Sequence, residues 1–209
     1  MSIPVLRPTI DQQIMKLPQI TLVAITGLNY KTQEHLKALE LSQKGLEFGD
    51  VKLLQLDSIK DIDSWNKAII YELPKYIETD FVILIHADGY IIHPELWTEE
   101  WLQYDYIGAP WPLPRDNFSY RDTSGVIQRV GNSVSLRSKR LIDLAPKLNL
   151  EWKSFHGFTN EDGFICVNYR HEYEKAGMKF APLEVAKYFS KEHTIPENKD
   201  LQTFAFHNL

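Results

Sequence analysis

The sequence predicts a single α/β domain in which a mostly parallel sheet is flanked by helices. Two apolar segments, ITLVAI at 20–25 and FVILI at 81–85, lack polar alternation and are rich in β-branched residues. Such segments are typical of strands that are buried on both faces of a parallel sheet. The chain opens as strand, turn, helix, strand, and this order favours a right-handed parallel unit. No internal repeat, low-complexity tract or linker interrupts residues 1–209, so we expect one domain.

The composition and net charge of the chain argue against several classes of function. Of the 209 residues, 44% are hydrophobic and 24% are charged, which is ordinary for a soluble globular protein. The net charge of -5 and the pI near 5.8 argue against nucleic acid as a partner, and any bound phosphate would need local groups or a metal to neutralise it. The one cysteine, Cys166, excludes an internal disulfide. Without a signal pattern or a long apolar run, we expect a cytoplasmic protein, with peripheral membrane association left open.

The first half of the chain is expected to alternate strands and helices. Residues 1–18 carry three prolines and form an extended lead-in. After the strand at 20–25, a glycine-bearing turn precedes a helix from Lys31 to about Gly45, and VKLLQL at 51–56 forms the next strand. This arrangement is typical of nucleotide-binding openings, although the full glycine fingerprint of dinucleotide binders is absent. Asp63 or Ser64 then caps a helix that Pro74 ends or kinks.

The central strand at 81–85 stops at His86-Ala87-Asp88-Gly89. The carboxyl end of a central strand is where open α/β sheets bind their ligands. Alternation along an extended chain places His86 and Asp88 on the same side. A carboxylate and an imidazole are suitable ligands for Mg²⁺ or Mn²⁺, but the segment is equally compatible with a plain Asp-Gly turn.

The second half carries three further polar clusters. Asp105–Pro114 is irregular, and its Trp111 either forms a wall for a ring or plugs the edge of the core. Gly131-Asn132 forms a tight turn that lets a ligand approach the backbone, and a short strand at 133–136 leads to a helix capped by Ser138. A helix from about Thr159 to Ala176 begins with adjacent acids, which serve either as helix-start residues or, for one of them, as a general base.

The order of these motifs resembles that of an uncharacterised group of bacterial glycosyltransferase-like proteins with the GT-A nucleotide-sugar fold, a Rossmann-like architecture. The resemblance runs from about Ile20 to the end of the chain. Each motif is short, so the specificity of the resemblance comes from their order: HADG, DYIGAPW, GNSVSLRS, NEDGF, FSKE and FAFH.

The resemblance implies a metal site for Mn²⁺ or Mg²⁺. Asp88 matches the second Asp of the Asp-x-Asp motif, which holds the cation that bridges the diphosphate of the donor. His86 replaces the first Asp, so it stays open whether residue 86 ligates the metal, contacts the ribose or does neither. The tail at 204–209 closes on the site, and its His207 completes the metal shell, although a lone tail histidine is more often structural.

The resemblance also implies contacts with the donor and a catalytic base. Asp162, with Glu161 beside it, matches the base of inverting members. Trp111, as a wall for a ring, is also expected to contact the donor. The other expected donor-binding residues are Thr26, Gly27, Asn29, Tyr30, Asp57, His86, Gly131, Asn132 and Ser133.

We therefore expect a metal-dependent, inverting glycosyltransferase that moves a sugar from a nucleotide-sugar donor, with UDP-sugars favoured. Its acceptor would be a glycan or a lipid-linked saccharide in bacterial surface polysaccharide synthesis, either alone or as part of a larger glycosyltransferase assembly. Without a base in place, a retaining route through the leaving phosphate opens. The alternatives are a non-catalytic nucleotide- or glycan-binding module and a sugar-phosphate nucleotidyltransferase. The latter usually opens with a glycine-rich loop that bears Arg and Lys, which Thr26–Lys31 lacks.

Overall fold

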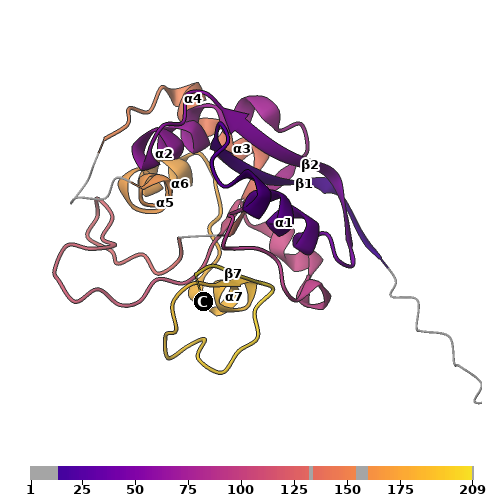
Figure 1. The fold of residues 1–209 in the computed structure, drawn as a ribbon. Helices are drawn as coiled ribbons and strands as arrows, with labels where there is room; N and C mark the ends of the chain where they lie inside the picture. Colours follow the sequence, from indigo (N-terminus) through magenta and orange to yellow (C-terminus); the bar gives the residue numbers. More distant parts are fainter. Residues whose placement is uncertain (1–13, 132–133, 154–159, 209) are drawn as a thin grey trace, which may run out of the picture.

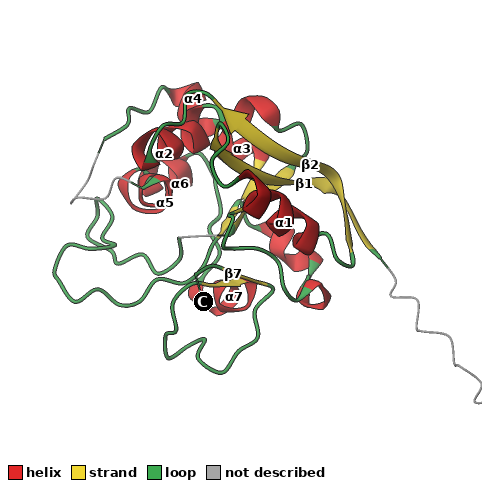
Figure 2. Ribbon diagram, viewed as in Figure 1, coloured by secondary structure: helices red, strands yellow, loops and turns green. Residues whose placement is uncertain are grey.

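The computed structural model describes residues 14–131, 134–153 and 160–208. In this part of the chain a five-stranded sheet has the order β2-β1-β3-β5-β4, and Figure 2 shows β1 and β2 side by side. The strands are β1 (Met15–Gly27), β2 (Leu46–Leu56), β3 (Phe81–Ile85), β4 (Tyr106–Ile107) and β5 (Ser135–Ser138). The first three strands are parallel, whereas β5 runs antiparallel to both β3 and β4. The α/β prediction is confirmed, but the sheet is mixed rather than mostly parallel, since two of its pairings are antiparallel.

Helices cover both faces of the sheet, and β3 lies at its centre. Val82 and Leu84 point into one apolar cluster, and Ile83 and Ile85 point into the other. The first cluster is covered by α2 (Ile62–Tyr71), α3 (Lys139–Ile142), α4 (Leu144–Leu148) and α6 (Arg170–Lys175), and the second by α1 (Thr32–Ser42) and α7 (Leu183–Phe189). Figure 1 shows α2, α5 and α6 grouped apart from α1 and α7. Burial on both faces explains why β3 lacks polar alternation.

The first two strands are longer than the sequence pattern indicates. They pair from Met15–Leu46 onward, and the register shifts between Leu17 and Thr21. At this irregularity the chain contains Pro18, which has no N–H to donate to a ladder. Its carbonyl oxygen lies only 2.0 Å from where a Cβ on Gly49 would be, so glycine is required there. The predicted lead-in at 1–18 therefore ends inside β1, and residues 1–13 lie outside the described part of the chain.

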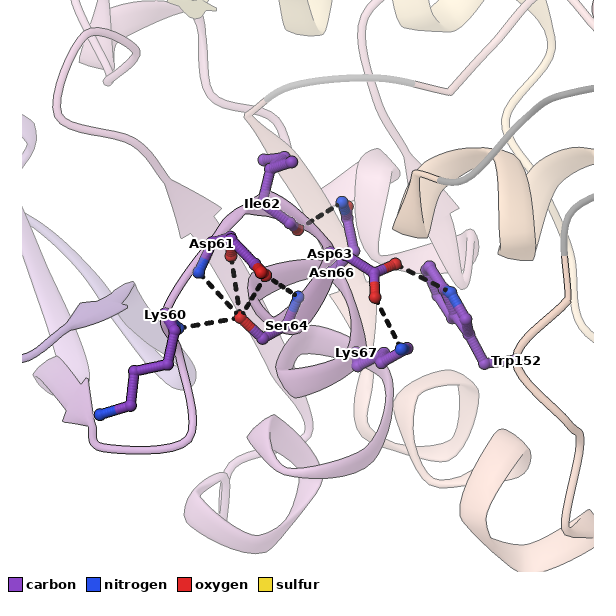
Figure 3. A network of polar contacts seen from close by, with 8 residues as sticks. All are labelled: Lys60, Asp61, Ile62, Asp63, Ser64, Asn66, Lys67 and Trp152. Atoms are coloured by element: carbon purple, nitrogen blue, oxygen red, sulfur yellow. Dashed lines mark hydrogen bonds and ion pairs between the residues drawn. The ribbon is translucent and has the colours of Figure 1, made fainter.

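The prediction that Asp63 or Ser64 caps α2 is wrong, because the cap is Asp61. The Asp61 carboxylate accepts from the Ser64 backbone N–H at 2.8 Å, and the Ser64 hydroxyl accepts from the Asp61 N–H at 2.9 Å (Figure 3). This reciprocal pair is a capping box, which satisfies two backbone donors at once. Asp63 instead contacts Lys67 at 2.6 Å and accepts from the Trp152 indole at 3.2 Å.

The helix predicted to run to about Ala176 is interrupted. After α5 (Glu161–Gly163), residues Phe164–Asn168 form a π-helical turn (η4), and α6 follows after a break at Tyr169. The Tyr169 N–H donates to the Phe164 carbonyl at 2.9 Å, which is the five-residue spacing of a π-turn. The predicted stop at Gly177 is confirmed by its φ of 82°. The proposed Thr159 cap lies outside the described residues.

The remaining elements are short, and they bring the C-terminal tail beside the segment that follows β3. Short 3₁₀ turns are η1 (Leu73–Tyr76), η2 (Pro94–Leu96) and η3 (Glu99–Gln103). Ser138 caps α3 as predicted, and its hydroxyl accepts from the Leu141 N–H at 3.2 Å. A second, two-stranded sheet pairs β6 (Ser190–Lys191) with β7 (Ala205–Phe206). Figure 1 shows the C-terminus beside β7 and α7.

Candidate functional site

A cavity of about 820 Å³ opens at the carboxyl ends of β1, β2 and β3. Since these strands are parallel, their carboxyl ends meet at one edge of the sheet, where the cavity is lined by Thr26 near the end of β1 and by Asp57 and Asp88 after β2 and β3. The opposite wall comes from the start of α5 and from the segment after β6. This is the position at which open α/β sheets bind ligands, and the volume lies within the usual range for small-molecule sites.

The structure brings most of the predicted site residues to this cavity. Its lining includes Thr26, Gly27, Tyr30, Asp57, His86, Asp88, Glu161, Asp162 and His207. Asn29 is adjacent in sequence but is not among the described lining residues. Asn132 and Ser133 lie outside the described part of the chain.

Trp111 and Gly131 belong to the core rather than to the cavity. The Trp111 side chain is 3% exposed and its ring stacks on Tyr120 with centroids 4.8 Å apart. A Cβ on Gly131 would fall 2.0 Å from the indole, so this glycine makes room for the tryptophan. These contacts favour the alternative in which Trp111 plugs the edge of the core, and they correct the expectation that both residues face a donor sugar.

The tail is bound directly to the turn that follows β3. His86 and Gly89 close a tight turn, in which the His86 N–H donates to the Gly89 carbonyl at 2.8 Å. The Asn208 N–H donates to the Asp88 carbonyl at 3.2 Å, and the His207 ring stacks on His86 with centroids 4.7 Å apart. A Cβ on Gly89 would lie 2.7 Å from Cδ2 of His207. Glycine is therefore what lets the tail imidazole approach the turn so closely.

His207 lies between two carboxylates. Its Nε2 is 3.3 Å from Oδ1 of Asp88, and its Nδ1 is 3.4 Å from Oε1 of Glu192. Burial alone would lower the pKa of His207, but the Glu192 and Asp88 carboxylates outweigh burial and raise it. Glu192 was not singled out from the sequence. It belongs to the FSKE motif, and only its place beside the tail reveals its contact with His207.

The donor set at this end of the cavity fits a divalent cation. Asp88 and Nε2 of His207 converge, and oxygen with imidazole nitrogen is a suitable combination for Mn²⁺ or Mg²⁺. Oε2 of Glu192 is buried and makes no hydrogen bond within the described part of the chain, while Oε1 of the same side chain lies 3.4 Å from Nδ1 of His207. Among the described residues no group of three His, Cys, Asp or Glu could hold a metal alone. A cation here would take its remaining ligands from a diphosphate or from water, as Mg²⁺ commonly does.

The two adjacent acids at the start of α5 have different environments. Glu161 forms a two-pronged ion pair with Arg137 at 2.7 and 2.9 Å, and both side chains are buried. Asp162 accepts from the Gly163 N–H at 2.7 Å. Burial, and after it the charge of Glu161, raises the pKa of Asp162 to about 7. The Glu161 carboxylate is thus held in its ion pair with Arg137. The pKa of Asp162, by contrast, suits a general base that works near neutral pH.

The opposite end of the cavity has an exposed aromatic ring. Tyr30 is 61% exposed and follows the β1 turn, in which a Cβ on Gly27 would fall 2.6 Å from the Ile59 carbonyl oxygen. Lys31 adopts a left-handed conformation with φ 45°, and its carbonyl contacts Nδ1 of His35 at 2.8 Å. This end can offer a π-face and a lysine to a nucleotide.

Several further lining residues were missed from the sequence, among them Trp65, Asn66 and His35. The Trp65 indole N–H donates to the Ile25 carbonyl at 2.8 Å, and its ring lies 5.5 Å from His86. Asn66 accepts from the Glu161 N–H at 2.9 Å and so fixes the start of α5. His35 is buried in α1. No pattern in the sequence distinguishes these residues from ordinary helix residues.

Comparisons with known proteins address the fold and the family. A family model described as "Protein of unknown function (DUF5672)" matches residues 50–207. No curated protein matches the sequence. No helix among the described residues is both long and apolar enough to cross a lipid bilayer.

Two solved structures share the fold. One is described as a glycosyltransferase involved in the glycosylation of the major capsid of PBCV-1; it has a TM-score of 0.59 and 13% identity, with 90% of this chain and 92% of that chain covered. The other is the galactosyltransferase LgtC in complex with donor and acceptor sugar analogues, with a TM-score of 0.52, 11% identity, and 90% and 86% coverage. The predicted GT-A-like α/β fold is therefore confirmed.

Proposed function

We propose that this chain, which belongs to the DUF5672 family, is a metal-dependent glycosyltransferase that uses a nucleotide-sugar donor. The observation that carries the proposal is one cavity at the sheet edge that combines the Asp88–His207 pair, the buried Asp162 and the exposed Tyr30 ring. The glycosyltransferases with the same fold support the general class. We favour a UDP-sugar donor and a glycan or lipid-linked acceptor in surface polysaccharide synthesis.

The donor diphosphate would lie at the inner end of the cavity. Asp88 and His207 would hold the Mn²⁺ or Mg²⁺ ion there, with His86 stacked against His207. A bound cation neutralises the charge that develops on a leaving nucleoside diphosphate. Beside His207 the cavity is lined by the carboxylates of Asp88 and Glu192 rather than by a cluster of anion-binding groups. A diphosphate could therefore bind at this end only together with a cation. Tyr30 would stack on the base, with Thr26 and Asp57 beside the nucleoside.

Asp162 would act as the base that takes the proton of the acceptor hydroxyl. Its raised pKa matches a base that works near neutral pH, and general-base catalysis contributes roughly 10²- to 10⁴-fold in rate. Arg137 neutralises Glu161, so a single carboxylate remains for this role. Direct displacement with such a base inverts the configuration of the transferred sugar.

A second candidate function is a non-catalytic nucleotide- or glycan-binding module. One observation favours it: His86, which stands where the matching motif has its first Asp, stacks on the His207 ring and lies at a tilt against the Trp65 ring. His86 and His207, two of the expected metal ligands, pack against each other. Such a site could bind a nucleotide without transferring its sugar.

A thermal-shift screen of nucleoside diphosphates and nucleotide-sugars, with and without Mn²⁺, tests the proposal. Ligands that bind the native state raise the melting temperature, so we expect stabilisation by one nucleotide only when Mn²⁺ is present. Metal-dependent stabilisation without hydrolysis or transfer of the sugar would favour the binding module. The absence of stabilisation by any of these compounds would contradict both the transferase and a nucleotide-binding module.

A further inference from the structure

Glu192 follows β6 and lies across the His207 ring from Asp88. Asp88 faces Nε2 of the imidazole at 3.3 Å, whereas Glu192 faces Nδ1 at 3.4 Å. The Glu192 side chain is 13% exposed and lines the cavity. Because the two carboxylates contact opposite nitrogens, Glu192 is badly placed to bind a cation held by Nε2. Its contact is with the histidine.

The backbone fixes this juxtaposition. The His207 N–H donates to the Lys191 carbonyl at 2.9 Å, and Lys191 pairs with Phe206 in the small sheet. Glu192 and His207 are therefore the next residues along two paired strands. On the other side, Gly89 leaves space for the imidazole but for little else. The pairing keeps the backbones of Glu192 and His207 side by side, and the close approach to Gly89 limits the space on the other face of the ring.

The position of the ring proton decides what Nε2 can do. A neutral imidazole carries its proton on one nitrogen and a lone pair on the other. Of the two neighbours of the ring, Glu192 is the more buried, and its Oε2 lacks any hydrogen bond within the described part of the chain. Nδ1 of His207 also lacks a hydrogen bond among the described residues, and Glu192 is the carboxylate that lies 3.4 Å from it. A proton on Nδ1 would face this carboxylate, and the Nε2 lone pair would then face Asp88. Two electron-rich atoms at 3.3 Å repel unless a cation lies between them.

We propose that Glu192 is a positioning residue, which holds His207 in the tautomer and orientation that present the Nε2 lone pair to a metal ion at Asp88. This proposal rests on the proposed function, since it assumes the cation site. Carboxylates that contact the second nitrogen of a ligating histidine fix its orientation and raise its basicity, and their loss costs about 10- to 100-fold in metal affinity. The competing explanation is an imidazolium that links Asp88 and Glu192 and serves only the fold.

Mn²⁺ titrations followed by the electron paramagnetic resonance signal of the free ion distinguish these explanations. We expect Glu192→Gln to weaken Mn²⁺ binding about 10- to 100-fold, and Glu192→Asp to restore part of the affinity. The melting temperature without metal should change little. Glu197→Gln is the matched control, because Glu197 is also partly buried, pairs with Arg129 at 3.2 Å and has an oxygen without a hydrogen bond in the described residues, but does not line the cavity.

Asp88→Asn separates failure of this inference from failure of the proposed function. If Asp88→Asn loses Mn²⁺ while Glu192→Gln binds it like the wild type, the cation site stands and the role of Glu192 is refuted. If Glu192→Gln mainly lowers the melting temperature measured without metal, His207 is an imidazolium that links Asp88 and Glu192 and serves only the fold. If the wild-type protein binds no Mn²⁺, the metal site of the proposed function is itself refuted, and the role of Glu192 with it.

Discussion

The two ends of the cavity are built differently. At the outer end, Tyr30 is 61% exposed, and the Lys60–Asp57 ion pair beside it is open to solvent. At the inner end, Glu161 lines the cavity and forms an almost fully buried, two-pronged ion pair with Arg137, which is not itself among the described lining residues. Buried pairs hold one geometry because breaking them leaves an uncompensated charge, whereas exposed pairs are worth little. The inner end is thus suited to chemistry with fixed geometry, and the outer end to recognition that tolerates movement.

The largest effect should come from Asp88→Asn at the inner end. Removing the carboxylate removes the charge that holds the cation, and metal ions contribute several kcal/mol to such reactions. We expect transfer to fall below detection, by roughly 10⁴-fold or more, and metal-dependent donor binding to disappear in calorimetry. Unchanged donor affinity in this variant would remove Asp88 from the metal site.

Asp162→Asn should lower transfer by roughly 10²- to 10⁴-fold and leave donor affinity unchanged. Because the carboxylate must be ionised to accept a proton, wild-type kcat/KM should rise with pH up to about 7, and the variant should lose this rise. Glu161→Gln is not a matched control, since it leaves Arg137 unpaired in the core. Turnover near the wild-type value in Asp162→Asn would place the base elsewhere or indicate a retaining route.

The same carboxylate affects stability with a predictable sign. The pKa of Asp162 is raised in the folded state, so the folded protein holds this proton more tightly than the unfolded chain does. The resulting destabilisation is absent below the unfolded pKa, grows as the pH rises, and is complete above about 7. Asp162→Asn should therefore raise the melting temperature by several degrees at pH 8 and have little effect near pH 3. Equal shifts at both pH values would contradict the raised pKa.

A smaller effect is expected from Gly89→Ala, which tests how the tail reaches the inner end. The added methyl would lie 2.7 Å from the His207 ring and 3.0 Å from the Phe206 carbonyl oxygen, so the tail must shift. We expect Mn²⁺ affinity to fall about tenfold, with the sheet intact by circular dichroism. Wild-type Mn²⁺ affinity would show that His207 is not needed for the cation.

The smallest effect should come from Tyr30→Ala at the outer end. Stacking of a base on an aromatic ring is worth roughly 1–3 kcal/mol, so KM for the donor should rise about tenfold while kcat stays close to the wild-type value. Tyr76→Ala is the matched control, because Tyr76 is also exposed but does not line the cavity. An equal effect of both variants would exclude a specific role for Tyr30.

The residues of the inner end differ in how far the sequence could reveal them. The apolar run 81–85 and its abrupt polar end predicted both the central strand and Asp88, because burial on both faces leaves a clear pattern. Glu192 has no such pattern, since its role depends on a pairing between β6 and β7 that spans distant parts of the chain. The ion pair of Glu161 with Arg137 was missed for the same reason.

Predictions of local structure were wrong where tertiary contacts override the preferences of the local sequence. The π-turn at Phe164–Asn168 breaks a segment whose composition favours a continuous helix. Asp61, Asp63 and Ser64 are all acceptable caps, and only the reciprocal bonds of Asp61 and Ser64 decide among them. Trp111 was compatible with a ligand wall until its packing on Gly131 and Tyr120 placed it in the core.

The most direct test of the central claim is an anomalous difference map from crystals soaked with Mn²⁺ and UDP. We predict one strong peak within bonding distance of Oδ1 of Asp88 and Nε2 of His207, in contact with the diphosphate and inside the cavity. A peak elsewhere, or a bound nucleotide with no manganese between it and Asp88, would contradict a cation-dependent site at this edge of the sheet.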